Sequence, residues 1–141
     1  MSVKYVKEWI EKAEQDYQTI LILSRQRKRF LPDVICYHAH QCIEKYLKGL
    51  LASQDIKVPK THNLIFLVEQ LVKNHPELEL IKDALRDLNQ YAVELRYPGE
   101  TATKEEAKQA AKKVNEIRKT LLSKFFYSVI KDSNRSVAQL G

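Results

Sequence analysis

The sequence predicts an all-α protein, an antiparallel bundle of four to five helices with short connections. Three observations support this fold class. Five segments repeat apolar residues at the intervals of three and four that mark a helix. No segment shows the alternation of a half-buried β-strand. The 141 residues include only three Gly and four Pro, which leaves little material for turns and favours few, long elements in one domain.

The first two expected helices carry clear apolar stripes. The first runs from about Val3 to Arg27 and ends in the stretch RQRKRF, whose cations suit the C-terminal end of a helix dipole. Asp16 lies between apolar positions of this helix, so we expect it to pair with a basic residue on a neighbouring helix. The second begins at Pro32, a favoured first-turn residue, and fades over residues 53–60.

Three more helices are expected in the second half of the chain. The third opens at Thr61. The fourth opens with Pro76 near its first turn and continues through a heptad-like apolar repeat to the stretch RYPGE. The fifth begins at the stretch TKEE, which has the spacing of a capping box. The pattern therefore predicts a bundle domain over residues 1–127 and a frayed tail over residues 128–141.

Composition and charge narrow the class of protein. Hydrophobic residues make up 44% and charged residues 30%, as in an ordinary globular protein. The formal net charge of +6 favours an anionic partner. No apolar run reaches the length of a membrane span, and the N-terminus lacks the apolar core of a signal peptide. Cys36 and Cys42 fall on different sides of one expected helix, so they cannot bridge each other. We expect a reduced, cytoplasmic protein without membrane association.

A row of polar residues on the second helix is a candidate phosphate site. His38, Gln41, Lys45 and Lys48 follow one another at intervals of three and four, which places them along one side of the helix. Cations and hydrogen-bond donors in such a row could bind phosphate groups. The alternative, which the pattern alone favours, is a solvated face beside the core.

A second candidate lies where the fourth helix is expected to end. Arg96 and Tyr97 precede Pro98 and Gly99, which together stop a helix. Arg96 either complements the helix dipole or is held at a rigid corner for a phosphate, and Tyr97 either stacks on a base or covers the bundle end. His62, at the expected start of the third helix, either bonds a backbone group or approaches a bound anion.

Several other kinds of site are not expected. His38 and His40 are two residues apart on a helix, so they point in nearly opposite directions and cannot share a metal ion. The chain has no glycine-rich phosphate loop and no visible Ser/His/Asp set. The stretch RQRKRF lacks aromatic residues between its cations and belongs to no recognised nucleic-acid module. We therefore predict no catalytic residue, no metal and no cofactor.

The order of these features resembles the HEPN family, small all-α domains first grouped as nucleotide binders. The resemblance covers about residues 4–126. It rests on the ordered combination of Gln41, Glu44, Lys45, Lys48, Thr61, His62, Leu64, Arg96, Tyr97 and Pro98. It implies an antiparallel helical bundle that often forms a homodimer.

The resemblance implies two kinds of function. Some HEPN domains work beside a minimal nucleotidyltransferase encoded next door, sometimes as a toxin–antitoxin pair. Others are metal-independent ribonucleases, in which a His follows an Arg after a spacer of four to six residues. Here the residues at those spacings after Arg96 are Thr101, Ala102 and Thr103. None of them is a histidine, so the ribonuclease toxin, with RNA as its ligand, is the alternative hypothesis rather than the leading one.

The leading hypothesis is a nucleotide- or phosphate-binding module that takes ATP or GTP, forms a homodimer and partners a nucleotidyltransferase. Its binding residues would be Arg96, Tyr97, Lys45, Lys48, Gln41 and His38, with His62 as an accessory. A third hypothesis is a ligand-free interaction bundle. It predicts that carboxylates such as Asp16 and Glu44 occupy the basic stripe and leave no cleft there.

Overall fold

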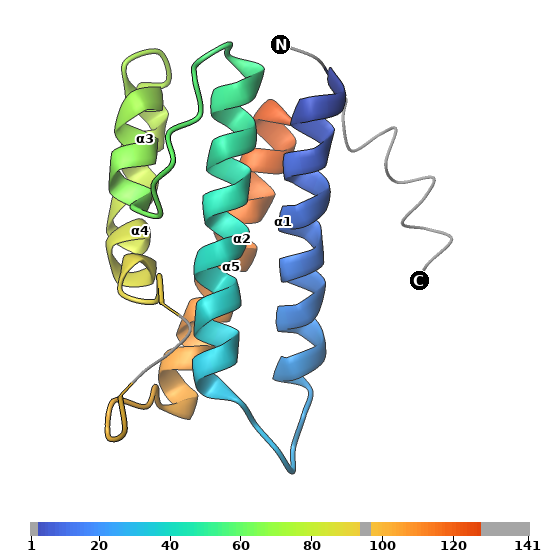
Figure 1. Ribbon diagram of the computed structural model, residues 1–141, viewed down its shortest axis with the longest axis vertical. Coiled ribbons are helices and arrows are strands. Elements are labelled where there is room, and N and C mark those ends of the chain that lie inside the picture. Colours follow the sequence, from blue (N-terminus) through green and yellow to red (C-terminus); the bar gives the residue numbers. More distant parts are fainter. Residues whose placement is uncertain (1–2, 94–96, 128–141) are drawn as a thin grey trace.

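The protein is an all-helical bundle in the computed structural model, which describes residues 3–93 and 97–127 (Figure 1). The elements are α1 (Val3–Ser24), α2 (Pro32–Ser53), α3 (Leu64–Val72), the 3₁₀ helix η1 (Pro76–Ile81), α4 (Lys82–Asn89) and α5 (Lys104–Phe125). The described ranges contain no strand, so the all-α prediction is confirmed. No helix within these ranges has the length and apolarity needed to cross a bilayer.

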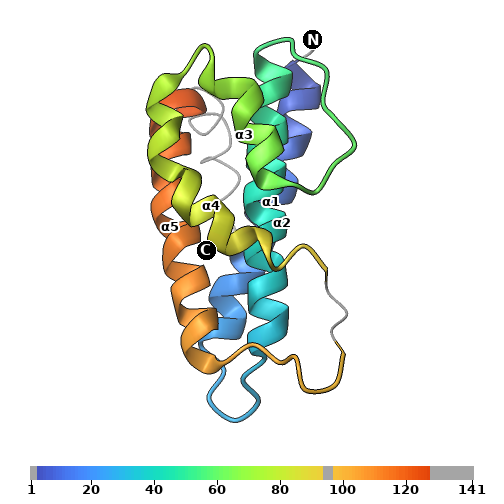
Figure 2. The ribbon, with the colours of Figure 1, turned by 90° about the vertical axis from the view of Figure 1, so that its left-hand side faces the viewer.

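The helix α2 is the centre of the bundle. It lies between α1 and the pair formed by α3 and α4, with α5 packed behind it, and α1 runs antiparallel to both α2 and α5 (Figures 1 and 2). Of its 22 residues 14 are buried, because neighbouring helices cover it on several sides. A polar residue of α2 therefore needs a partner from another element.

Close packing of α1 on α2 depends on Gly49. A Cβ atom at this position would lie 3.1 Å from Trp9 Cβ and 3.1 Å from Ile10 Cδ1. The absence of a side chain thus lets the two helix backbones approach at this level. Asp16 of α1 is also buried at this interface, at 7% exposure.

The third helix begins later than expected. Its first residue is Leu64 rather than Thr61, and Asn63 is the N-cap. The Asn63 Oδ1 atom accepts hydrogen bonds from the backbone N–H groups of Ile65 and Phe66. An asparagine at this position satisfies two of the donors that a helix start leaves free. The prediction that the helix opens at Thr61 was therefore wrong by three residues.

The fourth expected helix is shorter and divided in two. Pro76 opens the 3₁₀ helix η1, and α4 then ends at Asn89. The Asn89 side chain accepts a hydrogen bond from the Leu64 backbone N–H at 2.9 Å and donates one to Asn63. This contact ties the last residue of α4 to the start of α3. The prediction of one helix as far as RYPGE was wrong, because Ala92 and Val93 are not helical.

One end of the bundle brings together segments that are distant in sequence. The α1–α2 connection and the segment that leads into α5 both lie at the lower end in Figures 1 and 2. Asp33 of α2 accepts a hydrogen bond from the Ala102 backbone N–H at 2.7 Å. Thr103 and Glu106 form the predicted capping box at the start of α5. The predicted capping box is confirmed, and α5 starts from a fixed point at this end.

The first helix ends earlier than expected. The cations Arg25, Arg27, Lys28 and Arg29 lie after the end of α1 at Ser24, in the connection to α2. They are therefore not in the last turn of a helix, as the sequence suggested.

The aromatic residues near the helix ends fall into two groups. Tyr91 and Phe126 are buried in the core, and Tyr97 and Tyr127 are exposed. The homodimer that the resemblance implies stays a prediction. The predicted tail, residues 128–141, lies outside the described residues.

Candidate functional site

The first polar cluster joins α1 to α2 around Asp16. The carboxylate lies 2.5 Å from Lys45 Nζ and 2.8 Å from His38 Nδ1. An ionised carboxylate only accepts hydrogen bonds, so the Nδ1–H group of His38 is the donor. The prediction that Asp16 pairs with a basic residue of a neighbouring helix is confirmed.

The second polar cluster surrounds Glu44, on another side of α2. Its Oε2 atom lies 3.1 Å from Lys48 Nζ, and its Oε1 atom lies 2.8 Å from Nδ1 of His62. Glu44 and Lys48 are 4% and 6% exposed, whereas the His62 side chain is 69% exposed. The cluster fixes the segment before α3 onto α2.

His40 completes this second cluster from inside the core. It is fully buried, and its Nε2–H group donates to the backbone carbonyl oxygen of His62 at 2.8 Å. Its Nδ1 atom then accepts the hydrogen bond from Gln41 Nε2, at 3.4 Å. Burial lowers the pKa of His40, and the nearby Glu44 carboxylate offsets part of this effect. A neutral ring agrees with one donated and one accepted hydrogen bond.

The predicted stripe of α2 is therefore divided between two clusters. Lys45 and His38 face Asp16, whereas Lys48 faces Glu44 and Gln41 contacts His40. Each lysine forms an ion pair with a buried carboxylate of this chain. This is the arrangement that the hypothesis of a ligand-free bundle predicts for the stripe.

The predicted corner is only partly described. Arg96 lies outside the described residues, so its surroundings are not part of the site geometry. Tyr97 is 79% exposed and follows in the connection to α5. Gly99 has a φ of +93°, which supports the predicted sharp turn.

A cleft of about 400 Å³ lies at the lower end of the bundle, between the end of α1 and the start of α5. The residues that line it are Ser24, Gln26, Arg27, Phe30, Lys104, Ala107 and Lys108. Every charged residue in this lining is a cation. Within the described ranges no carboxylate pairs with Arg27, Lys104 or Lys108. Lys104 Nζ lies 5.6 Å from the centre of the Phe30 ring, at the distance of a cation–π contact.

Comparison with known proteins gives one match. The model of the HEPN domain matches residues 6–124, which is most of the chain. The chain belongs to the HEPN family. Comparison with curated proteins and with solved structures finds no match. The resemblance inferred from the ordered motifs is thus confirmed, and so is its extent to within a few residues.

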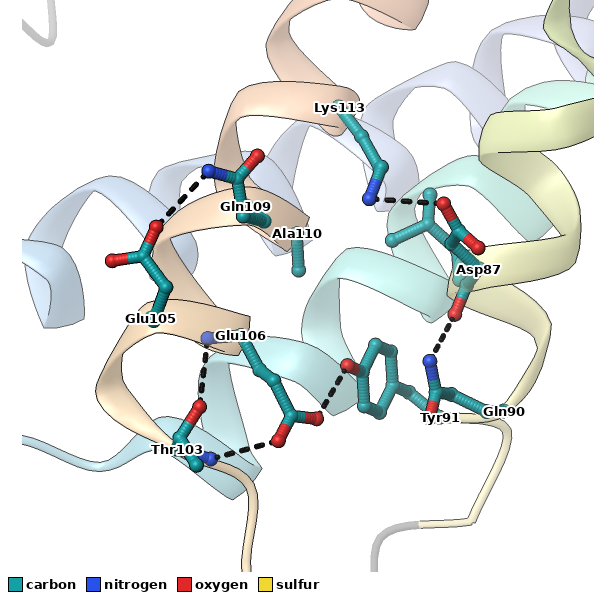
Figure 3. Close-up of a pocket in the computed structure, with 10 residues that line it drawn as sticks. Asp87, Gln90, Tyr91, Thr103, Glu105, Glu106, Gln109, Ala110 and Lys113 are labelled. Atoms are coloured by element: carbon teal, nitrogen blue, oxygen red, sulfur yellow. Dashed lines mark hydrogen bonds and ion pairs between the residues drawn. The ribbon is translucent and has the colours of Figure 1, made fainter.

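The HEPN domain has a second cleft, of about 340 Å³, between α4 and α5 (Figure 3). Its carboxylates are already occupied. Asp87 pairs with Lys113 at 3.1 Å, and Glu105 accepts from Gln109 at 3.1 Å. Glu106 accepts from the Tyr91 hydroxyl at 3.0 Å and closes the capping box. The polar residues of this cleft therefore serve to hold the start of α5 in place.

No group of three or more His, Cys, Asp and Glu side chains within the described ranges forms a metal site. Cys36 and Cys42 are buried and do not form a disulfide. Burial raises the pKa of the Cys42 thiol, and Asp16 and Glu14 add to that effect, so the thiol stays protonated.

Two features of the HEPN domain were not found from the sequence. Lys104 and Lys108 are one turn apart on α5, but nothing in their spacing places them beside the α1–α2 connection. The second is a cluster in which Arg118 of α5 holds Glu14 of α1, with Nη2–Oε2 at 2.8 Å, while the Tyr46 hydroxyl also donates to Glu14. Burial raises the pKa of Tyr46, so its hydroxyl keeps the proton that it donates.

Proposed function

We propose that this HEPN domain binds the phosphate groups of a nucleotide in the cleft between α1 and α5. The observation that carries the proposal is the cleft lining, in which Arg27, Lys104 and Lys108 are cations without a carboxylate partner among the described residues. Three cations around about 400 Å³ create a positive potential that attracts a multiply charged anion. Ser24 and Gln26 add hydrogen-bonding groups to the lining.

The location differs from the stripe on α2 that the sequence suggested. Lys45 and Lys48 would have to leave Asp16 and Glu44 to bind a phosphate, and each buried carboxylate would then keep only a histidine as its partner. Breaking a buried ion pair in this way costs at most about 3–5 kcal/mol. A ligand therefore meets less resistance at the cleft than at the stripe.

The wider role belongs to the same proposal. We propose a separately encoded minimal nucleotidyltransferase as the partner, in a two-component system of the toxin–antitoxin type, with the HEPN domain as a cytoplasmic homodimer. Membership of the HEPN family supports this part. Arg96 and Tyr97 remain candidates for the same phosphates, because the segment that follows them leads into the start of α5.

Thermal unfolding with and without ATP and GTP tests the proposal. A nucleotide that binds only the folded chain stabilises it by about 2.7 kcal/mol at one hundred times its dissociation constant, so the midpoint must rise. The double variant Lys104→Ala/Lys108→Ala should lose the rise. The control Lys112→Ala/Lys119→Ala removes the same charge from exposed positions of α5 outside the cleft and should keep it.

Three outcomes would contradict the proposal. If neither nucleotide raises the midpoint of the wild type, the hypothesis of a ligand-free interaction bundle takes its place, supported by the paired lysines of α2. If both double variants lose the rise equally, net charge rather than the cleft explains binding. A rise lost only in Arg96→Ala would move the nucleotide to the predicted corner.

A further inference from the structure

His62 is an exposed side chain that two buried residues hold in place. Its ring nitrogen Nδ1 lies 2.8 Å from Oε1 of Glu44, and its backbone carbonyl accepts the hydrogen bond from His40 Nε2 at 2.8 Å. Glu44 is 4% exposed and His40 is fully buried. An exposed surface residue normally has neither restraint.

These contacts fix the tautomer of the ring. Glu44 is paired with Lys48 at 3.1 Å, so its carboxylate is an acceptor and His62 Nδ1 must carry the hydrogen. The neutral ring then has its lone pair on Nε2. No contact within the described part of the chain uses Nε2, and the side chain is 69% exposed. The reactive nitrogen is therefore directed toward solvent.

Burial of the residues that hold this ring in place has an unfavourable free energy. Burying Glu44, Lys48 and His40 removes three polar groups from water, and only good hydrogen bonds offset that loss. Carboxylate orientation of one imidazole nitrogen is the device by which proteins fix the other nitrogen for chemistry. From α2, Glu44 contacts Nδ1 of His62 and His40 bonds its backbone carbonyl, while Lys48 pairs with Glu44.

We propose that Nε2 of His62 is a nucleophilic acceptor of a phosphoryl group from a small donor of the phosphoramidate or acyl phosphate class. The Nε2 lone pair attacks phosphorus and forms an N–P bond. The bond from phosphorus to the leaving group breaks, and its electron pair departs with ammonia or the carboxylate. The Nδ1 proton stays on the ring, and Glu44 stabilises the positive charge that develops there.

The exposure of His62 favours an acceptor over a general base. A general base acts on a substrate that the protein holds beside it. His62 lines neither of the two clefts. Its partner in reaction must therefore bring its own phosphoryl group to the surface, as a small activated phosphate does. Glu44 is the positioning residue of this site.

The chain supplies its own controls. His38 also donates Nδ1–H to a buried carboxylate, but its side chain is only 25% exposed. His75 has its Nε2 atom buried without a hydrogen-bond partner in the described structure. We therefore expect the order of reactivity His62, then His38, with His75 and the fully buried His40 inert.

Potassium phosphoramidate is the probe for the test. The folded wild type should take up one acid-labile phosphoryl group, detected by intact mass and mapped to His62 under alkaline conditions. His62→Gln should abolish it, and His38→Gln and His75→Gln should retain it. The folded chain should react about tenfold faster at His62 than the same chain unfolded in urea, a difference that corresponds to about 1.4 kcal/mol of activation free energy.

The comparison with the unfolded chain decides between positioning and mere exposure. Equal rates at His62 in the folded and unfolded chains, or labelling spread over all four histidines, would overturn the proposal. Glu44→Gln, checked by circular dichroism for an intact fold, should react at the unfolded rate. Nitrogen-15 shifts of the wild type provide a readout that does not depend on any variant, because they must show Nδ1 protonated and Nε2 bare in the neutral ring.

Discussion

Glu14 shows how a single residue connects three helices of the bundle. Its carboxylate accepts hydrogen bonds from Arg118 of α5 and from the Tyr46 hydroxyl of α2. The Arg118 guanidinium also lies 4.1 Å from the centre of the Tyr17 ring. Tyr46 is fully buried, so the hydroxyl depends on these partners.

Replacing Arg118 by Ala should destabilise the fold markedly. The substitution leaves Glu14 and the Tyr46 hydroxyl with one partner fewer in a largely buried position, and it removes the contact with the Tyr17 ring. We expect the free energy of unfolding in urea to fall by about 2 kcal/mol. Lys113→Ala, which breaks an exposed pair with Asp87, should change it by less than about 0.5 kcal/mol. Equal losses in the two variants would contradict this account.

His40 should make stability depend on pH. Its pKa is lowered by burial in the folded chain, whereas the unfolded chain titrates near the ordinary value of 6.5. As the pH drops below that value, the unfolded chain binds a proton that the folded chain does not, so the unfolded state is favoured. The contribution of neutral His40 to the free energy of unfolding is fully present above pH 6.5 and is lost on acidification. The free energy then falls by at most about 1.4 kcal/mol per pH unit.

Urea unfolding of the wild type and His40→Gln between about pH 5 and 7.5 checks this sign. The variant should be less stable at pH 7.5, because it loses the hydrogen bond from the imidazole to the His62 carbonyl. Its stability should fall less on acidification, because the imidazole that takes up the proton in the unfolded chain is gone. Parallel curves for the two proteins would assign the pH dependence to other groups.

At the scale of the element, the α1–α2 pair depends on a residue without a side chain. Gly49→Ala would be favourable by about 1 kcal/mol in an isolated helix. In the bundle the new Cβ atom would meet Trp9 Cβ and Ile10 Cδ1 at 3.1 Å each. The Ile10 methyl can turn away, but Trp9 Cβ moves only with the α1 backbone. We therefore expect Gly49→Ala to lower the thermal midpoint, and a higher midpoint would show that α1 shifts at no cost.

The element scale also shows what the sequence could predict. Helical period placed the long helices correctly, because α2 and α5 each bury a continuous apolar stripe. It failed for the fourth helix, since the apolar repeat continues past Asn89 while the Asn89 side chain bonds the start of α3. The same limit applies to the site. The spacing of Lys45 and Lys48 indicates on which side of α2 they lie. It does not show that Asp16, 29 residues before Lys45 in the sequence, contacts Lys45 from α1.

At the scale of the whole molecule, the cations of a chain of net charge +6 differ in whether a carboxylate is paired with them. The cations in the middle of α2 are paired with Asp16 and Glu44. Those of the cleft have no carboxylate partner in the described part of the chain. We therefore expect an anion to bind at the cleft rather than along α2.

Salt dependence of binding measures that localisation. For a single-stranded oligonucleotide held by Arg27, Lys104 and Lys108, the logarithm of the association constant should fall with the logarithm of the salt concentration with a slope of about −2, at about −0.7 for each neutralised phosphate. Lys104→Ala/Lys108→Ala should reduce the slope to about −0.7, because one of the three cations remains. Lys112→Ala/Lys119→Ala lowers the net charge equally and should leave the slope unchanged, since those lysines lie outside the cleft. Fluorescence anisotropy titrations at several salt concentrations supply the slopes. If the two double variants lose the same amount, the attraction arises from overall charge, and the cleft is not the binding site.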